Sequence, residues 1–133
     1  MILVVDANIL FSALIKDSST AKLLFEESLN LCTSEFIIQE FFKYEDMILE
    51  KTHRTKEQFI QIMHMLKDII TVVPKEEYSD FMSEAESISP DEKDTLYFAL
   101  ALKFRCGIWS NDKRLRTQDK IQVYSTSDVM KFI

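Results

Sequence analysis

Two carboxylates directly follow apolar segments, at positions that chemistry explains better than packing does. Asp6 comes straight after the apolar run of residues 2–5, and Asp112 lies just beyond the apolar segment that ends at Trp109. If both segments are parallel strands, the two side chains share the carboxyl edge of one sheet, where ligands of open α/β sheets bind. We interpret both as candidate site residues, with a turn or helix-capping role as the alternative for Asp6 and a turn role as the alternative for Asp112.

Two further carboxylates are predicted to face inward from helices. Glu40 falls three residues after Ile37 and four before Tyr44, on the apolar stripe of its helix. Asp94 falls one turn before Tyr97, in the most apolar helix of the chain. An inward carboxylate needs a partner, because burying an unpaired charge is unfavourable. A set of Asp and Glu without His or Cys favours Mg²⁺, which binds oxygen ligands and keeps several of its waters.

The composition predicts a single domain over residues 1–133 and excludes several functions. The one glycine, Gly107, rules out the glycine-rich loops of nucleotide-binding folds. A net charge of −6 argues against a broad cationic surface for duplex DNA, although a local basic patch stays open. Cys32 and Cys106 are interpreted as free thiols of a reducing compartment. The apolar start reaches Asp6 without the pattern of a signal peptide or a membrane span, so we expect a cytoplasmic protein.

Apolar runs alternate with helical patterns along the chain and predict the fold class. Buried strands are expected at residues 2–5, 30–33, 69–73, 106–109 and 121–124. Helices are expected at residues 8–16, 18–29, 34–51, 55–67, 75–88, 90–104 and 128–133, with Ser34 as one N-cap and the Thr55/Gln58 pair as a capping box. The alternation predicts an α/β protein, a three-layer α/β/α sandwich with a central, mostly parallel five-stranded sheet.

Four segments, taken in order, resemble the PIN domain family of small nucleases, and the resemblance covers the whole chain. The run Val-Val-Asp6-Ala-Asn8 resembles the opening strand and D-x-N motif of the family. Glu40 and Asp94 are similar to its second and third acidic positions. The run Trp-Ser110-Asn-Asp112 resembles its late Thr/Ser-x-Asp motif, with serine where threonine is common.

The resemblance implies an activity, a cofactor and a set of roles. It implies a ribonuclease that prefers single strands and depends on Mg²⁺ or Mn²⁺, in which an activated water attacks the phosphorus and leaves 5′-phosphate and 3′-hydroxyl ends. The implied roles are metal ligation by Asp6 and Asp94, contact with metal-bound waters or a second ion by Glu40 and Asp112, and ligand orientation or phosphate contact by Asn8 and Ser110. Asp91 is interpreted as a helix cap, and no clear carboxylate follows Asp112 closely, Asp119 being uncertain, so the number of metal ions stays open.

A basic segment beside Asp112 predicts where nucleic acid binds. It consists of Lys113, Arg114 and Arg116. Residues 75–94, in contrast, carry eight carboxylates and two lysines. We expect the basic segment to contact RNA phosphates at the mouth of the acidic site. The alternative phosphate-binding set is Lys51, Arg54 and Lys56.

Other functions stay open at this point. A phosphoacceptor receiver domain has a similar size and topology, but it needs an acceptor Asp after its third strand, where this chain has Val73-Pro74. The more serious alternative is a PIN-like module with little activity that binds RNA or a protein partner. Within the family, toxins that pair with an antitoxin protein and stand-alone processing nucleases share these motifs. The Met-rich surface around His64 is interpreted as ordinary packing or as a homodimer interface.

Overall fold

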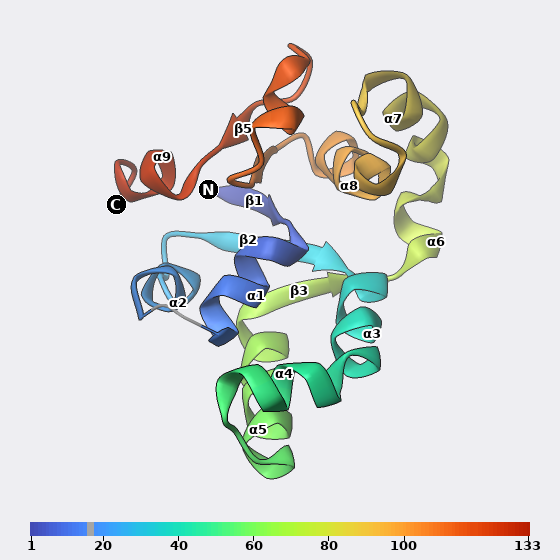
Figure 1. Ribbon diagram of the computed structural model, residues 1–133. Coiled ribbons are helices and arrows are strands. Elements are labelled where there is room, and N and C mark those ends of the chain that lie inside the picture. Colours follow the sequence, from blue (N-terminus) through green and yellow to red (C-terminus); the bar gives the residue numbers. More distant parts are fainter. Residues whose placement is uncertain (16–17) are drawn as a thin grey trace.

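A five-stranded parallel sheet forms the centre of the molecule (Figure 1). The computed structural model describes residues 1–15 and 18–133, and within them the strand order is β3-β2-β1-β4-β5. The strands are β1 Ile2–Val5, β2 Asn30–Ser34, β3 Ile70–Val73, β4 Gly107–Trp109 and β5 Val123–Tyr124. Every pairing between these strands is parallel, so the predicted α/β class and parallel sheet are confirmed.

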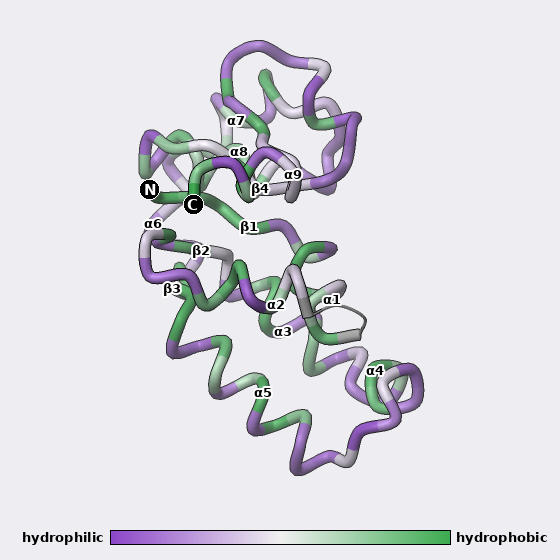
Figure 2. The backbone as a smooth tube through the Cα atoms, turned by 90° about the vertical axis from the view of Figure 1, so that its left-hand side faces the viewer, coloured by the Kyte–Doolittle hydropathy of each residue, from purple (hydrophilic) through white to green (hydrophobic). Residues whose placement is uncertain are grey.

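The central strand, β1, is buried on both faces. Leu3, Val4 and Val5 are each at most 1% exposed, and the strand pairs with β2 on one side and with β4 on the other. This burial explains why β1 is an uninterrupted apolar run and not an alternating one. In Figure 2 the tube is hydrophobic along β1 and turns hydrophilic just after the strand ends. The polar residues at that point begin the candidate site.

Gly107 allows β4 and β5 to pack closely. A Cβ added at Gly107 would lie 2.6 Å from a ring carbon of Tyr124 and 2.9 Å from the carbonyl oxygen of Gln122. Glycine within a strand often marks such a close approach. The one glycine of the chain therefore has a packing role in the sheet.

Helices cover both faces of the sheet. Right-handed crossovers place the helices that connect β1 to β2 and β2 to β3 on one face, and those that connect β3 to β4 on the other. Figure 1 follows this arrangement, with α8 against β1, β2 and β4. The α-helices are α1 Ala7–Ile15, α2 Ser18–Leu24, α3 Glu35–Lys43, α4 Glu45–Thr52, α5 Lys56–Ile69, α6 Lys75–Tyr78, α7 Met82–Ile88, α8 Thr95–Phe104 and α9 Thr126–Met130. Three 3₁₀ turns are η1 Ser79–Phe81, η2 Glu92–Asp94 and η3 Lys113–Thr117 within the described ranges.

The helix predicted for residues 34–51 is in fact two helices. Ser34 caps α3 as predicted, because its hydroxyl accepts the N–H of Phe36 at 3.1 Å. The chain bends at Tyr44, which ends α3 and begins α4 with φ of −100° and ψ of 23°. The bend turns Tyr44 outward, and its side chain is 47% exposed although the stripe pattern predicted it to be buried. Neither Gly nor Pro marks this position, so the local sequence carries no signal for the break.

Several other predicted helix boundaries were wrong. The helix predicted for residues 18–29 ends at Leu24, and Phe25 is 48% exposed. The acidic helix of residues 75–88 is divided into α6, η1 and α7. Tyr78, the last residue of α6, is buried, with its hydroxyl 2.7 Å from that of Ser34. The helix predicted from residue 90 begins as η2, and the last helix starts two residues before Asp128. The predicted end of the first helix at Lys16 lies outside the described residues.

Two further features complete the fold. The capping box of Thr55 and Gln58 at the start of α5 is present as predicted. A second capping box, formed by Ser125 and Asp128, begins α9. None of the helices in the described parts of the chain is both long and apolar enough to cross a membrane.

Candidate active site

Asp6 is a buried carboxylate at the carboxyl end of β1. Asp6 is 4% exposed, and its backbone N–H donates to the carbonyl oxygen of Trp109 at 3.3 Å. The Asp6 Oδ1 accepts the N–H of Ile9 at 2.9 Å, so Asp6 also caps the first turn of α1. The capping role left open by the sequence is therefore real, and it fixes the carboxylate at the edge of the sheet.

Ser110, which follows β4, connects two of the predicted carboxylates. It is fully buried, and its Oγ accepts the backbone N–H of Asp112 at 3.0 Å. Its side chain also hydrogen-bonds the carboxylate of Asp6. Because an ionised carboxylate only accepts, the Ser110 hydroxyl is the donor in that contact. One serine thus orients Asp6 and the loop that carries Asp112.

Four aspartates are electrostatic neighbours at this edge. The charges of Asp94 and Asp112 raise the pKa of Asp6, and the charges of Asp91 and Asp112 raise the pKa of Asp94. We call Asp6, Asp91, Asp94 and Asp112 the acidic cluster. Asp91 performs the capping role predicted for it, since its Oδ1 accepts the N–H of Lys93 at 2.9 Å. Its membership in the cluster was not predicted, because the spacing of Asp91 explains the cap and says nothing about the distant Asp112.

Burial and repulsion raise the pKa of two of these carboxyls. Burial raises the pKa of Asp6, hydrogen bonds from Ser110 and Ile9 lower it, and the charges of Asp94 and Asp112 raise it again. Burial likewise raises the pKa of Asp94, followed by the charges of Asp91 and Asp112. Burial is the largest cause of both shifts and the neighbouring carboxylates add to it, so the ionised forms of Asp6 and Asp94 are disfavoured. A cation bound at this edge of the sheet would favour the ionised forms of both carboxyls.

Arg114 bonds directly to the other end of the cluster. Its Nη2 lies 2.8 Å from Oδ2 of Asp112, and its Nη1 lies 3.4 Å from Oδ2 of Asp91. The hydrogen bonds from Arg114 lower the pKa of Asp112 below its usual range. The sequence predicted Arg114 as a phosphate contact, and in the structure its guanidinium pairs with carboxylates.

Tyr97 is a site residue that sequence reasoning missed. It is 5% exposed, and its hydroxyl oxygen accepts the backbone N–H of Ala7 at 2.9 Å. Burial raises the pKa of the phenol, the bond from Ala7 lowers it, and the charges of Asp6 and Asp94 raise it further. Tyr97 was predicted only as an inward residue on the stripe of Asp94, and that stripe was the available signal.

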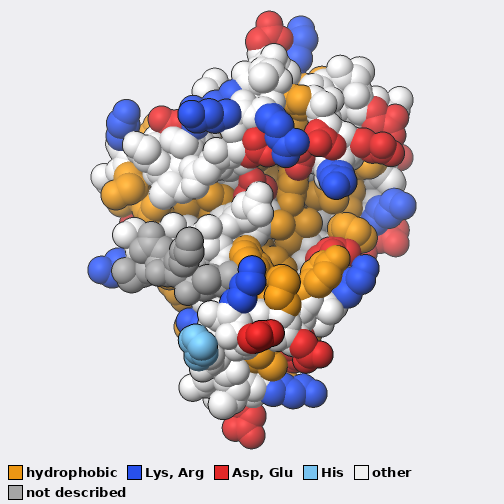
Figure 3. Space-filling view, viewed as in Figure 1, with side chains coloured by type: hydrophobic (Ala, Val, Ile, Leu, Met, Phe, Trp, Pro, Cys, Tyr) orange, Lys and Arg blue, Asp and Glu red, His pale blue; other side chains and the backbone are white. Residues whose placement is uncertain are grey.

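The remaining predicted residues are not members of the acidic cluster. Glu40 is half-buried on α3 and is not among the charged neighbours of Asp6 or Asp94, and Asn8 is exposed in the first turn of α1. Arg116 pairs with Asp128 at 3.2 Å. Lys113 is exposed and has no ion-pair partner within the described ranges. Figure 3 shows acidic and basic side chains intermingled over the upper part of this face, with hydrophobic side chains in the hollow below them.

Comparison with known proteins identifies the family. Residues 4–126 match the family model described as a PIN domain. The chain belongs to the PIN domain family. PIN domains are generally nucleases that depend on divalent metal ions, and a nuclease role follows for this one in general terms.

A similar solved structure is the crystal structure of VapBC2 from Rickettsia felis bound to a DNA fragment from their promoter. It is 16% identical with a TM-score of 0.66, and the match covers 94% of this chain and 98% of that one. That likeness supports the fold. Among curated proteins, none matches the sequence significantly.

The residues of this PIN domain fit a hydrated divalent ion. Within the described residues, no three or more Asp, Glu, His or Cys side chains form a ready-made ligand group. Mg²⁺ needs less than that, since it keeps several waters and takes one or two carboxylates. Asp6 and Asp94 supply two carboxylates whose pKa values are raised by burial and by neighbouring carboxylates, and a cation beside them would favour their ionised forms. The donor set therefore suits Mg²⁺ or Mn²⁺ and not a softer metal.

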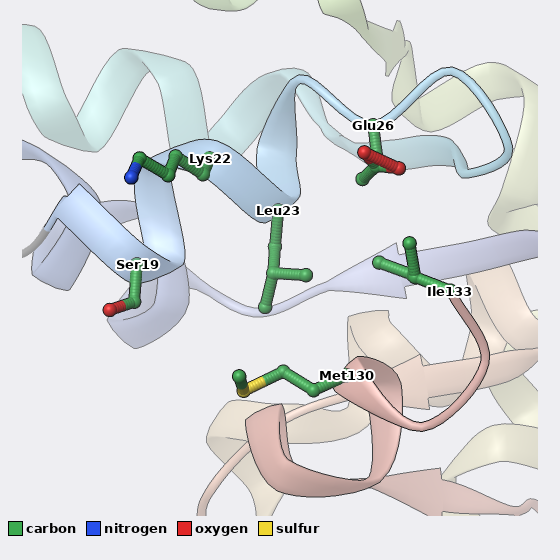
Figure 4. A pocket seen from close by; sticks show the side chains of 6 residues that line it. All are labelled: Ser19, Lys22, Leu23, Glu26, Met130 and Ile133. Carbon is green, nitrogen blue, oxygen red and sulfur yellow. The ribbon is translucent and has the colours of Figure 1, made fainter.

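A separate pocket of about 360 Å³ lies away from the acidic cluster of the PIN domain. Figure 4 shows it between α2 and the C-terminal segment, with Leu23 opposite Met130 and Ile133. None of the predicted site residues lines it. The pocket contains none of the members of the acidic cluster, so we place the candidate active site at the cluster and not at this pocket.

Proposed function

We propose that this PIN domain is a Mg²⁺- or Mn²⁺-dependent ribonuclease that hydrolyses phosphodiester bonds of single-stranded RNA. The observation that carries the proposal is the buried carboxylate of Asp6, held by Ser110 at the carboxyl edge of the sheet with Asp94 and Asp112 as charged neighbours. Enzymes place uncompensated carboxylates at such edges where a cation will bind.

Each residue has a distinct role in this proposal. Asp6 and Asp94 would hold the divalent ion, which when bound supplies an activated water and offsets charge on the phosphate. Ser110 keeps the Asp6 carboxylate in one orientation through its donated hydrogen bond. Asn8, exposed two residues after Asp6, would contact the phosphate. Glu40 would act through an intervening water, since it is no direct charged neighbour of Asp6.

Phosphate binding would come from a local basic segment and not from the overall charge of −6. Lys113 is exposed directly after Asp112 and is the strongest candidate. Arg114 and Arg116 are exposed but already pair with carboxylates, so each would have to exchange that pair for an RNA phosphate. Such contacts bind the backbone of RNA without reading its sequence.

The test compares substrates and ions. An unstructured RNA oligonucleotide, the DNA of the same sequence and an RNA duplex are incubated with the protein in Mg²⁺, Mn²⁺ or EDTA. We expect cleavage of the single-stranded RNA alone, in either metal and not in EDTA. Asp6→Asn and Asp94→Asn should remove the cleavage while leaving a folded protein. Cleavage that persists in EDTA, or in both variants, would refute the proposal.

A second candidate function is a protein-binding role, as the toxin half of a toxin–antitoxin pair. Six large hydrophobic side chains of the α3–α5 region are at least 37% exposed: Phe36, Phe42, Tyr44, Met47, Ile60 and Met65. Exposed hydrophobic side chains in such number are typical of protein interfaces when they gather into one patch. The similarity to VapBC2 suggests an antitoxin as the partner, and a second copy of this chain is the alternative partner that we consider. Light scattering of the purified chain, alone and with the product of a neighbouring gene, would distinguish the two.

The proposed site of action is the cytoplasm. Cys32 and Cys106 are free thiols. Burial raises the pKa of Cys32 to about 12 and that of Cys106 to about 11, so both stay protonated. Free thiols are usual in a reducing compartment, where an RNA substrate is also available. Fractionation of cells that express a tagged chain would test this location.

A further inference from the structure

We propose that Arg114 is a built-in counter-ion of the acidic cluster and takes the place of a second metal ion, so that the site binds one divalent ion and not two. The inference rests on the proposed metal-dependent function and adds to it the number of ions. It also assigns Arg114 a role as a positioning residue for Asp112 and Asp91.

Arg114 occupies both carboxylate oxygens of Asp112. Its backbone N–H donates to Oδ1 at 2.9 Å, and its Nη2 donates to Oδ2 at 2.8 Å. Its Nε lies 3.3 Å from each of the two oxygens. An ion that used Asp112 as a direct ligand would have to displace this guanidinium first.

The same guanidinium spans two carboxylates. While Nη2 contacts Asp112, Nη1 reaches Oδ2 of Asp91 at 3.4 Å. A planar guanidinium suits this arrangement because its donors point in fixed directions, and it keeps its charge at any ordinary pH. The short 3₁₀ turn η3 places it there, since Asp112 caps the turn and Arg114 is the second residue within it.

The charges of the two ends of the cluster therefore differ. At one end, Asp91 and Asp112 share the positive charge of Arg114. At the other end, Asp6 and Asp94 form no ion pair within the described ranges. Arg114 does act on Asp94 from a distance, because its charge lowers the pKa of that carboxyl. A single divalent ion held by Asp6 and Asp94 would compensate the end with which Arg114 forms no ion pair.

Arg116 provides a matched control. It lies in the same 3₁₀ turn and pairs with one aspartate, Asp128, at 3.2 Å. Its side chain is 41% exposed, compared with 68% for Arg114. Arg116→Gln thus removes an exposed arginine and one ion pair from the same turn without touching the acidic cluster. Any effect specific to the cluster should appear in Arg114→Gln alone.

The experiment measures Mn²⁺ binding to the purified chain by electron paramagnetic resonance of the free ion, with no RNA present. We expect one Mn²⁺ per wild-type chain and per Arg116→Gln chain. Arg114→Gln should bind the first Mn²⁺ about five- to tenfold more tightly, the Coulomb effect of removing one unit charge near a divalent ion in a solvent-exposed site. It should also gain a second, weaker Mn²⁺. Arg114→Lys keeps the charge and should bind the first Mn²⁺ within about twofold of wild type.

Several results would overturn the inference. Two Mn²⁺ ions in wild type would show that Arg114 does not replace an ion, while leaving the proposed nuclease function intact. An Arg114→Gln affinity equal to that of Arg116→Gln would show that Arg114 does not compete with the metal. No Mn²⁺ binding in wild type would refute the inference and the proposed function together. If Arg114→Gln does not fold, the wild-type stoichiometry and the Arg114→Lys affinity still decide the question.

Discussion

The hydroxyl oxygen of Tyr97 accepts the backbone N–H of Ala7 at 2.9 Å, across 90 positions of sequence. The bond joins α8, which begins directly after Asp94, to the first turn of α1, which begins directly after Asp6. Asp6 and Asp94, the two carboxylates that we assign to the metal, thus precede two helices that the buried Tyr97 connects. Their relative position depends on this contact as well as on the packing of α8 against β1.

Removal of the Tyr97 hydroxyl should destabilise the fold. Tyr97→Phe leaves the partly buried N–H of Ala7 without its acceptor, which we expect to lower the free energy of unfolding by about 1–2 kcal/mol. Urea denaturation of the metal-free protein measures the change. Tyr124→Phe, at a half-buried position on β5, is the control and should be close to neutral. Equal stability of wild type and Tyr97→Phe would contradict the structural role of the bond.

The raised pKa of Asp6 predicts how stability depends on pH without metal. The folded state binds the Asp6 proton more tightly than the unfolded state, in which the pKa is near its ordinary value of 3.8. Ionisation therefore destabilises the fold as pH rises from 3.8 through the folded pKa. Asp6→Asn should melt higher than wild type at neutral pH in EDTA, with the difference vanishing in acid. Mn²⁺ should raise the melting temperature of wild type only. A variant that melts lower than wild type in EDTA at neutral pH would be inconsistent with this charge effect.

Glu40 has the least structural support of the predicted carboxylates and needs its own test. Glu40→Gln keeps the shape of the side chain, so we predict a folded protein whose cleavage rate falls at least about 100-fold, or roughly 3 kcal/mol in the barrier. Glu45→Gln, on α4, is the control and should cleave at the wild-type rate. Unchanged cleavage by Glu40→Gln would mean that the acidic cluster works without α3.

Lys113 should account for part of the salt dependence of RNA binding. For single strands, the logarithm of affinity falls with the logarithm of salt by about 0.7 for each phosphate neutralised, so Lys113→Gln should flatten the slope by about that amount. The measurement is RNA affinity in Ca²⁺ from low to moderate salt, which we expect to permit binding with little cleavage. Lys56→Gln tests the alternative set at the turn between α4 and α5. A flatter slope for Lys56→Gln alone would move the phosphate contact to that turn.

The sequence predicted the sheet well because burial leaves a direct local pattern. The apolar run of β1 and the carboxylates that follow β1 and β4 could be recognised from the residues next to them in the sequence. The break at Tyr44 and the role of Tyr78 depend on contacts with distant parts of the chain, for which no local signal exists. The ion pair of Arg114 with Asp91 joins positions 23 apart, and a basic residue after a catalytic motif suggested phosphate binding instead.

The most direct test of the account is the fate of the attacking oxygen. Single-stranded RNA is cleaved by the wild-type chain in water enriched in oxygen-18, with Mn²⁺ present, and the new ends are analysed by mass spectrometry. If a water molecule attacks the phosphorus, the heavy oxygen will appear in a 5′-phosphate, and the other product will end in a plain 3′-hydroxyl. Formation of a 2′,3′-cyclic phosphate would contradict the account, because the RNA's own 2′-hydroxyl would then be the nucleophile.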